Sequence, residues 1–88
     1  MNPEQREMLR LSLLTIASPA THYGISLEVF RVYLRARGFN VETDVIQAEL
    51  QYLVEKGFVE LCAKSLSPEN KLWKITADGR DFLAVNNL

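Results

Sequence analysis

The chain has 88 residues, of which 48% are hydrophobic and 24% are charged, a balance typical of one folded domain. Ten basic and eleven acidic side chains give a net charge of -1, which excludes the positive field of a general nucleic-acid binder. A single cysteine, Cys62, excludes an internal disulfide and a cysteine-rich zinc site. The first residues lack a secretory signal pattern and no apolar run is long enough to span a bilayer, so we expect a soluble cytoplasmic protein without a membrane partner.

The first predicted helix covers residues 3–17. It starts favourably because Asn2 can cap it and Pro3 fits the first turn, and it ends before Pro19. A brief edge strand is predicted at residues 23–25, where the chain reads Tyr-Gly-Ile.

Two further helices are predicted over residues 27–37 and 44–56, with Ser26 and Thr43 as their N-caps and a glycine after each. The earlier of the two is expected to turn four apolar residues toward the core: Leu27, Phe30, Val32 and Leu34. The later one repeats its apolar positions at helical spacing, at Ile46, Leu50, Leu53 and Val54.

After the second of these glycines the hydrophobic period changes from 3.6 to 2, which predicts a β-hairpin with strands over residues 58–64 and 71–75. Thr76 then caps a short last helix through Ala84. We expect one domain over residues 1–84 and a flexible tail over residues 85–88.

Two helices followed by a β-hairpin form the winged helix-turn-helix arrangement, a mainly α fold with a small antiparallel hairpin. Residues 48–61 (AELQYLVEKGFVEL) and 71–84 (KLWKITADGRDFLA) resemble the recognition helix, wing and closing helix of winged-helix regulators. The opening residues and the short length also resemble small winged-helix proteins of Mu-like phages and prophages, which are labelled transcriptional regulators of the arsenic-sensor type. The resemblance implies a phage-encoded regulator of transcription.

The chain offers little for catalysis or for metal binding. Its lone histidine, His22, lies 40 positions from its lone cysteine, Cys62. The sequence therefore shows no nucleophile next to a general base and no cluster of metal ligands. The glycines are too far apart for a phosphate-binding loop. We expect no enzyme activity, no metal and no cofactor.

Double-stranded DNA is the partner that a winged helix predicts, with the third helix in the major groove and the wing on the backbone. Gln47 and Gln51 are spaced to read adenine edges, and Tyr52 is predicted on the same outer face. The remaining predicted DNA contacts lie at the start of that helix, on the second helix and around the wing: Thr43, Arg31, Arg35, Lys64, Asn70 and Lys71.

The charge around the third helix argues against this function. Residues 41–60 hold five acidic residues and one lysine, a local charge of -4, whereas phosphate contacts supply most of the affinity for DNA. The alternative is therefore a winged-helix adaptor that binds a protein partner and does not bind DNA through this acidic helix.

The first helix carries two apolar sectors. Four residues are expected to face the core, namely Leu9, Leu13, Ile16 and Ala17. A second sector consists of Met8, Leu11 and Leu14. The second sector predicts a symmetric homodimer in which the first helix meets its own copy. The alternative is that the last helix, through Phe82 and Leu83, folds back and covers it.

Overall fold

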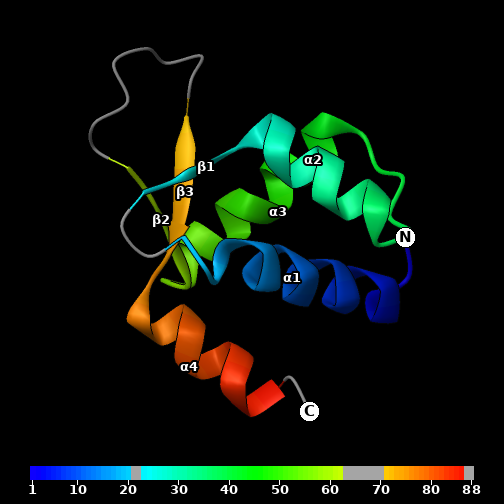
Figure 1. Cartoon of the computed structure of the whole chain (residues 1–88). Coiled ribbons are helices and arrows are strands. Elements are labelled where there is room, and N and C mark those ends of the chain that lie inside the picture. Colours follow the sequence, from blue (N-terminus) through cyan, green and yellow to red (C-terminus); the bar gives the residue numbers. More distant parts are fainter. Residues whose placement is uncertain (21–22, 63–70, 87–88) are drawn as a thin grey trace.

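The computed structural model describes residues 1–20, 23–62 and 71–86, and it forms the predicted mainly α fold with a small antiparallel sheet (Figure 1). The elements are α1 (Pro3–Ala17), β1 (Ile25–Ser26), α2 (Leu27–Ala36), α3 (Thr43–Glu55), β2 (Val59–Leu61), β3 (Leu72–Ile75) and α4 (Ala77–Asn86). The sheet has the strand order β1-β3-β2, and both pairings are antiparallel. No helix among the described residues has both the length and the apolar character needed to cross a membrane.

The helix starts follow from their capping residues. The Asn2 side chain accepts a hydrogen bond from the Gln5 backbone N–H at 2.8 Å, and Gln5 returns the bond to Asn2, which is a capping box. Ser26 caps α2 by accepting from the Val29 N–H at 3.3 Å. The prediction for Thr43 is wrong by one residue, because α3 already includes it and Glu42 stands at the N-cap without a side-chain bond.

One core joins all four helices to the sheet. It contains the four residues predicted on the inner face of α1. Phe30 of α2 packs edge-on against Trp73 of β3 with ring centroids 6.4 Å apart. Val32 is not part of this core: it is 57% exposed, so the prediction that it faces inward is wrong.

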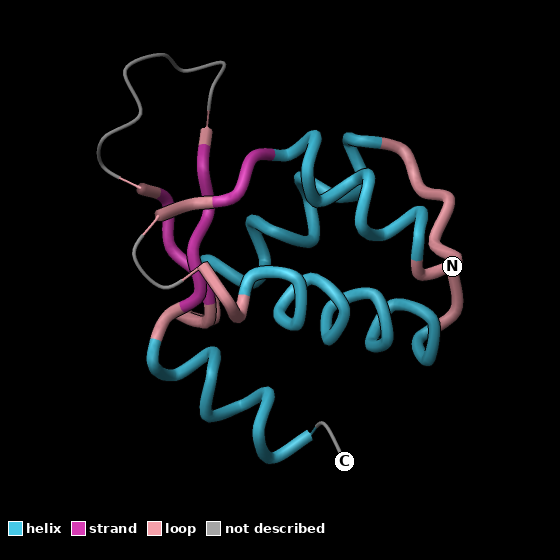
Figure 2. The backbone as a smooth tube through the Cα atoms, in the orientation of Figure 1, coloured by secondary structure: helices cyan, strands magenta, loops and turns pink. Residues whose placement is uncertain are grey.

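The second apolar sector of α1 is covered only in part, and α4 lies beside α1 (Figure 2). Leu14 is fully buried and Leu83 is 9% exposed, both in the same core cluster, while Phe82 stacks on Phe58 at 4.5 Å. Leu14 therefore has no surface to offer a second copy, and the prediction that it lies at a dimer interface is wrong. The helix also continues to Asn86, so residues 85 and 86 belong to α4 and not to the predicted tail.

Strand β1 connects the sheet to α2. Ile25 lies opposite Trp73 and Ser26 opposite Leu72 of β3. A Cβ atom on Gly24 would lie 2.5 Å from the Leu72 Cβ, so only glycine lets the chain approach β3 this closely.

Candidate nucleic-acid interface

The outer face of α3 is polar and exposed. Ile46, Leu50 and Leu53 are buried on the inner side, which turns Gln47 and Gln51 outward, one helical turn apart. Ala48 is exposed between them, and the same face carries two carboxylates, Asp44 and Glu55. The structure thus brings together the two predicted reading residues on an accessible surface.

The first turn of α3 is also exposed. Thr43 lies in that turn, and the Asp44 carboxylate accepts a hydrogen bond from the Val45 backbone N–H at 3.0 Å. A helix N-terminus attracts anions, but here the Asp44 carboxylate already supplies a negative charge. A phosphate at Thr43 would therefore have to approach beside this carboxylate.

Tyr52 does not share the outer face, contrary to the prediction. It is half-buried on the flank of α3 that faces α1, where the guanidinium carbon of Arg10 lies 3.7 Å from the centre of its ring. The ring is thereby held against α1 by a cation–π contact, and Tyr52 serves packing between helices.

Glu49 lies on the same α1-facing flank, although the charge count over residues 41–60 included it among the acidic residues around the third helix. Only 9% of the residue is exposed, its Oε2 lies 2.5 Å from the Arg10 Nε, and its Oε1 lies 3.6 Å from the Arg6 Nε. Two arginines of α1 therefore balance this carboxylate away from the outer face. The local charge of -4 along the sequence overstates the negative charge that a ligand of α3 would meet.

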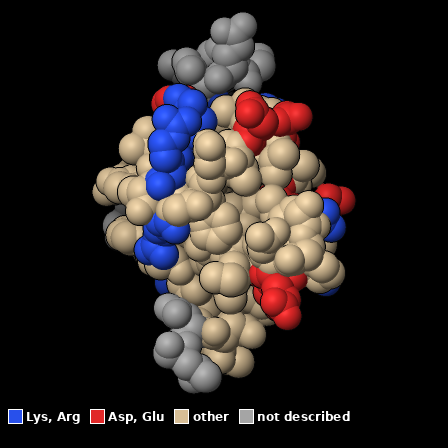
Figure 3. Space-filling model, turned by 90° about the vertical axis from the view of Figure 1, so that its right-hand side faces the viewer, with Lys and Arg blue, Asp and Glu red and all other residues tan. Residues whose placement is uncertain are grey.

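The arginines of α2 differ in their availability. Arg31 donates a hydrogen bond to Glu28, which lowers the pKa of the Glu28 carboxyl and raises the pKa of Arg31. Arg35 is exposed and makes no ion pair with any described residue. Figure 3 shows a band of basic side chains along one side of this face, with an acidic group next to its upper end.

At the base of the hairpin, one lysine of the described residues makes no ion pair with another described residue. Lys71 is exposed, whereas the Lys74 Nζ lies 3.3 Å from a carboxylate oxygen of Glu60. Lys74 therefore balances the charge of Glu60, which is a further acidic residue of the segment 41–60. The predicted contacts Lys64 and Asn70, as well as His22, lie outside the described residues.

The helix pair α2–α3 followed by the β2–β3 hairpin places the chain in the winged helix-turn-helix fold class. Among solved structures, that of SSV1 F-93 is similar, with a TM-score of 0.56 and 17% sequence identity over 85% of this chain and 79% of that chain. At this identity the likeness shows the fold alone. No protein-family model and no curated protein matches the sequence. The winged-helix prediction is confirmed, whereas the phage origin and the arsenic-sensor label stay predictions.

Proposed function

We propose that this protein binds double-stranded DNA as a small regulator of transcription, with α3 in the major groove. The observation that carries the proposal is the outer face of α3, where Gln47 and Gln51 are exposed one turn apart while Glu49 is paired on the opposite flank. The amide of each glutamine offers the donor and acceptor that match N7 and N6 of adenine. The phage origin belongs to the same proposal and rests on the sequence resemblance alone.

Phosphate contacts are assigned to Arg35, Lys71 and Arg31. Arg35 and Lys71 are exposed, and the exposed pair of Arg31 with Glu28 is weak enough for a phosphate to replace the carboxylate. Two full contacts and the partly neutralised Arg31 correspond to a slope between about -2 and -3 in a plot of log affinity against log salt. The protein is therefore expected to bind DNA modestly and to depend on base contacts for specificity.

The second candidate function is a protein-binding adaptor on the same scaffold. It is favoured by the absence of lysine and arginine from the outer face of α3 within the described helix, together with the exposed carboxylates of Asp44 and Glu55. These carboxylates would repel the DNA backbone and would suit a basic protein surface.

A fluorescence anisotropy titration with a random duplex at two salt concentrations separates the two functions. Binding that weakens steeply with salt, and that Arg35→Gln reduces, supports the DNA-binding function. Arg80→Gln is the matched control, because Arg80 is exposed on α4 and carries the same charge. No binding at the lowest salt concentration would overturn the proposal and favour the adaptor.

The homodimer stays a prediction. Without Leu14, the second sector of α1 offers only Met8, which is 60% exposed, and the accessible part of Leu11. Light scattering over a concentration series measures the association, and a mass near that of the 10.0 kDa chain at high concentration would exclude it.

A further inference from the structure

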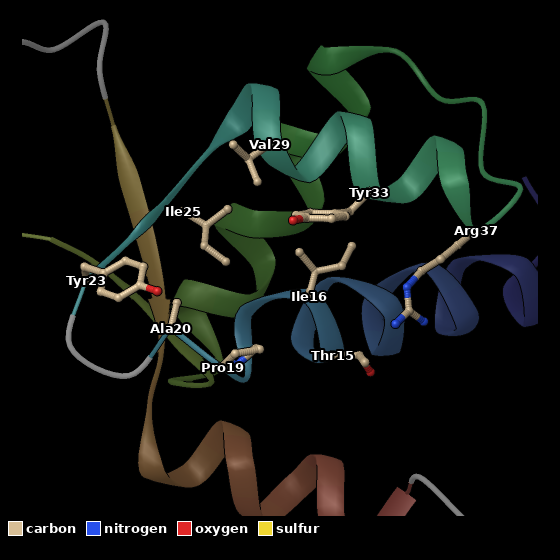
Figure 4. A pocket seen from close by; sticks show the side chains of 9 residues that line it. All are labelled: Thr15, Ile16, Pro19, Ala20, Tyr23, Ile25, Val29, Tyr33 and Arg37. Carbon is tan, nitrogen blue, oxygen red and sulfur yellow. The ribbon is translucent and has the colours of Figure 1, made fainter.

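A groove of about 450 Å³ lies between α1, α2 and β1, away from the residues assigned to DNA (Figure 4). Ile16 of α1, Ile25 of β1 and Val29 of α2 form its aliphatic walls, and Tyr33 lies over it from α2. Among the described residues, none of those that line it comes from α3 or from the hairpin. An occupant and a duplex would therefore contact different residues.

The walls of this groove remain accessible in the folded chain. Val29 is 39% exposed and Tyr33 is 54% exposed, and Val32 continues the same apolar flank of α2. The volume lies within the range of small-molecule sites, which combine apolar walls with a few polar groups. The site is thus shaped for the flat apolar part of a small ligand.

Arg37 supplies the polar group at one end. It follows the last turn of α2, it is exposed, and its guanidinium extends toward α1 in Figure 4. It makes no ion pair within residues 1–20, 23–62 and 71–86. A planar guanidinium at the end of an apolar groove is complementary to a carboxylate, which it can bind through two parallel hydrogen bonds.

We propose that this groove binds a small aromatic carboxylate. The ring lies between Ile16, Val29 and Tyr33, and the carboxylate is held by Arg37. Apolar contact supplies binding energy for the ring, and the guanidinium selects the anion over a neutral analogue of the same shape.

The test uses two probes of matched shape, 2-naphthoate and the neutral 2-naphthalenemethanol, in isothermal titration calorimetry with the full chain. We expect saturable 1:1 binding with naphthoate preferred. Arg37→Gln should lower the affinity for naphthoate about tenfold and leave the alcohol unchanged, because it removes only the charged hydrogen bonds. Tyr33→Ala should weaken both probes, since it removes an exposed wall of the groove.

Arg35→Gln is the matched control, because it makes the same change on α2 at an exposed position that does not line the groove. Equal losses from Arg35→Gln and Arg37→Gln would overturn the proposal, as would equal affinity for the two probes or no saturable binding. Amide NMR spectra at rising protein concentration test for a second copy. Concentration-dependent shifts at Ile16, Val29 and Tyr33 would show that another chain fills the groove, and would also overturn the proposal.

Discussion

The two sides of α3 use their polar residues in opposite ways. On the flank facing α1, Glu49 and Tyr52 are held by Arg10, through an ion pair at 2.5 Å and a cation–π contact at 3.7 Å. On the outer face, Gln47 and Gln51 are exposed. A carboxylate on the flank facing α1 therefore fixes the position of α3, whereas a carboxylate on the outer face repels an anion.

This difference changes the electrostatic argument about DNA. Glu49 lies about two helical turns from Glu42 and from Glu55, yet its charge is matched by Arg6 and Arg10. The exposed carboxylates that a duplex would meet on α3 are those of Asp44 and Glu55. The paired flank positions the helix, and the outer face leaves Gln47 and Gln51 accessible.

The largest expected effect is the loss of the paired flank. Arg10→Ala removes the short ion pair of Glu49 and the cation on Tyr52, leaving a largely buried carboxylate with only the longer contact to Arg6. We expect the free energy of unfolding to fall by about 2–3 kcal/mol, measured by urea denaturation. The exposed Arg35→Ala should change it by less than about 0.5 kcal/mol. Equal effects of the two variants would show that the two sides do not differ in this way.

Substitutions on the outer face of α3 should change the specificity of DNA binding and leave the stability of the fold unchanged. Once a preferred duplex is selected, Gln47→Ala and Gln51→Ala should each reduce its discrimination from random sequence by about 1–3 kcal/mol. Their urea midpoints should stay close to the original, because both side chains are exposed. Anisotropy titrations with both duplexes measure the effect, and losses that are equal for both sequences would remove α3 from the role of reader.

The phosphate contacts should give a smaller effect that is the same for all sequences. Arg35→Ala and Lys71→Ala should each lower the magnitude of the salt slope by about 1. Arg31→Ala should lower it less, because Glu28 already neutralises this guanidinium. A titration series in salt gives the three slopes, and a larger change for Arg31→Ala than for Arg35→Ala contradicts the assignment.

The smallest effect concerns the exposed ion pair between Glu28 and Arg31 on α2. It contrasts with the largely buried ion pair between Arg10 of α1 and Glu49 of α3. The hydrogen bond from Arg31 lowers the pKa of Glu28 in the folded chain. The pair therefore stabilises the fold above the ordinary pKa of glutamate, and this contribution is lost as the pH falls through the lowered value. An NMR titration of the Glu28 carboxyl carbon measures it, and Arg31→Gln should raise the midpoint toward the ordinary value. An unchanged midpoint would show that Arg31 does not hold this carboxylate in solution.

Much of the fold could be predicted because its signals are local. Capping residues mark the starts of α1 and α2, the glycines at 38 and 57 end two helices with positive φ angles, and hydrophobic spacing identifies the inner face of α3. The exposure of Gln47 and Gln51 follows from the same spacing.

The contacts between distant segments could not be predicted in this way. The bond between Arg10 and Glu49 joins residues 39 positions apart, and it depends on how α1 lies across α3. The position of Leu14 was open for the same reason, since its apolar sector suited a second copy as well as α4. The extension of α4 to Asn86 gives that helix the length to lie along α1.

Ser26 belongs to two elements at once, since it pairs with Leu72 in the sheet and caps α2 through the Val29 N–H. No linker residue therefore separates strand β1 from helix α2. An insertion between residues 25 and 27 would have to break the strand register or the cap. The number of residues between the sheet and α2 is therefore fixed by the fold, and evolutionary change in length is excluded at this point of the chain.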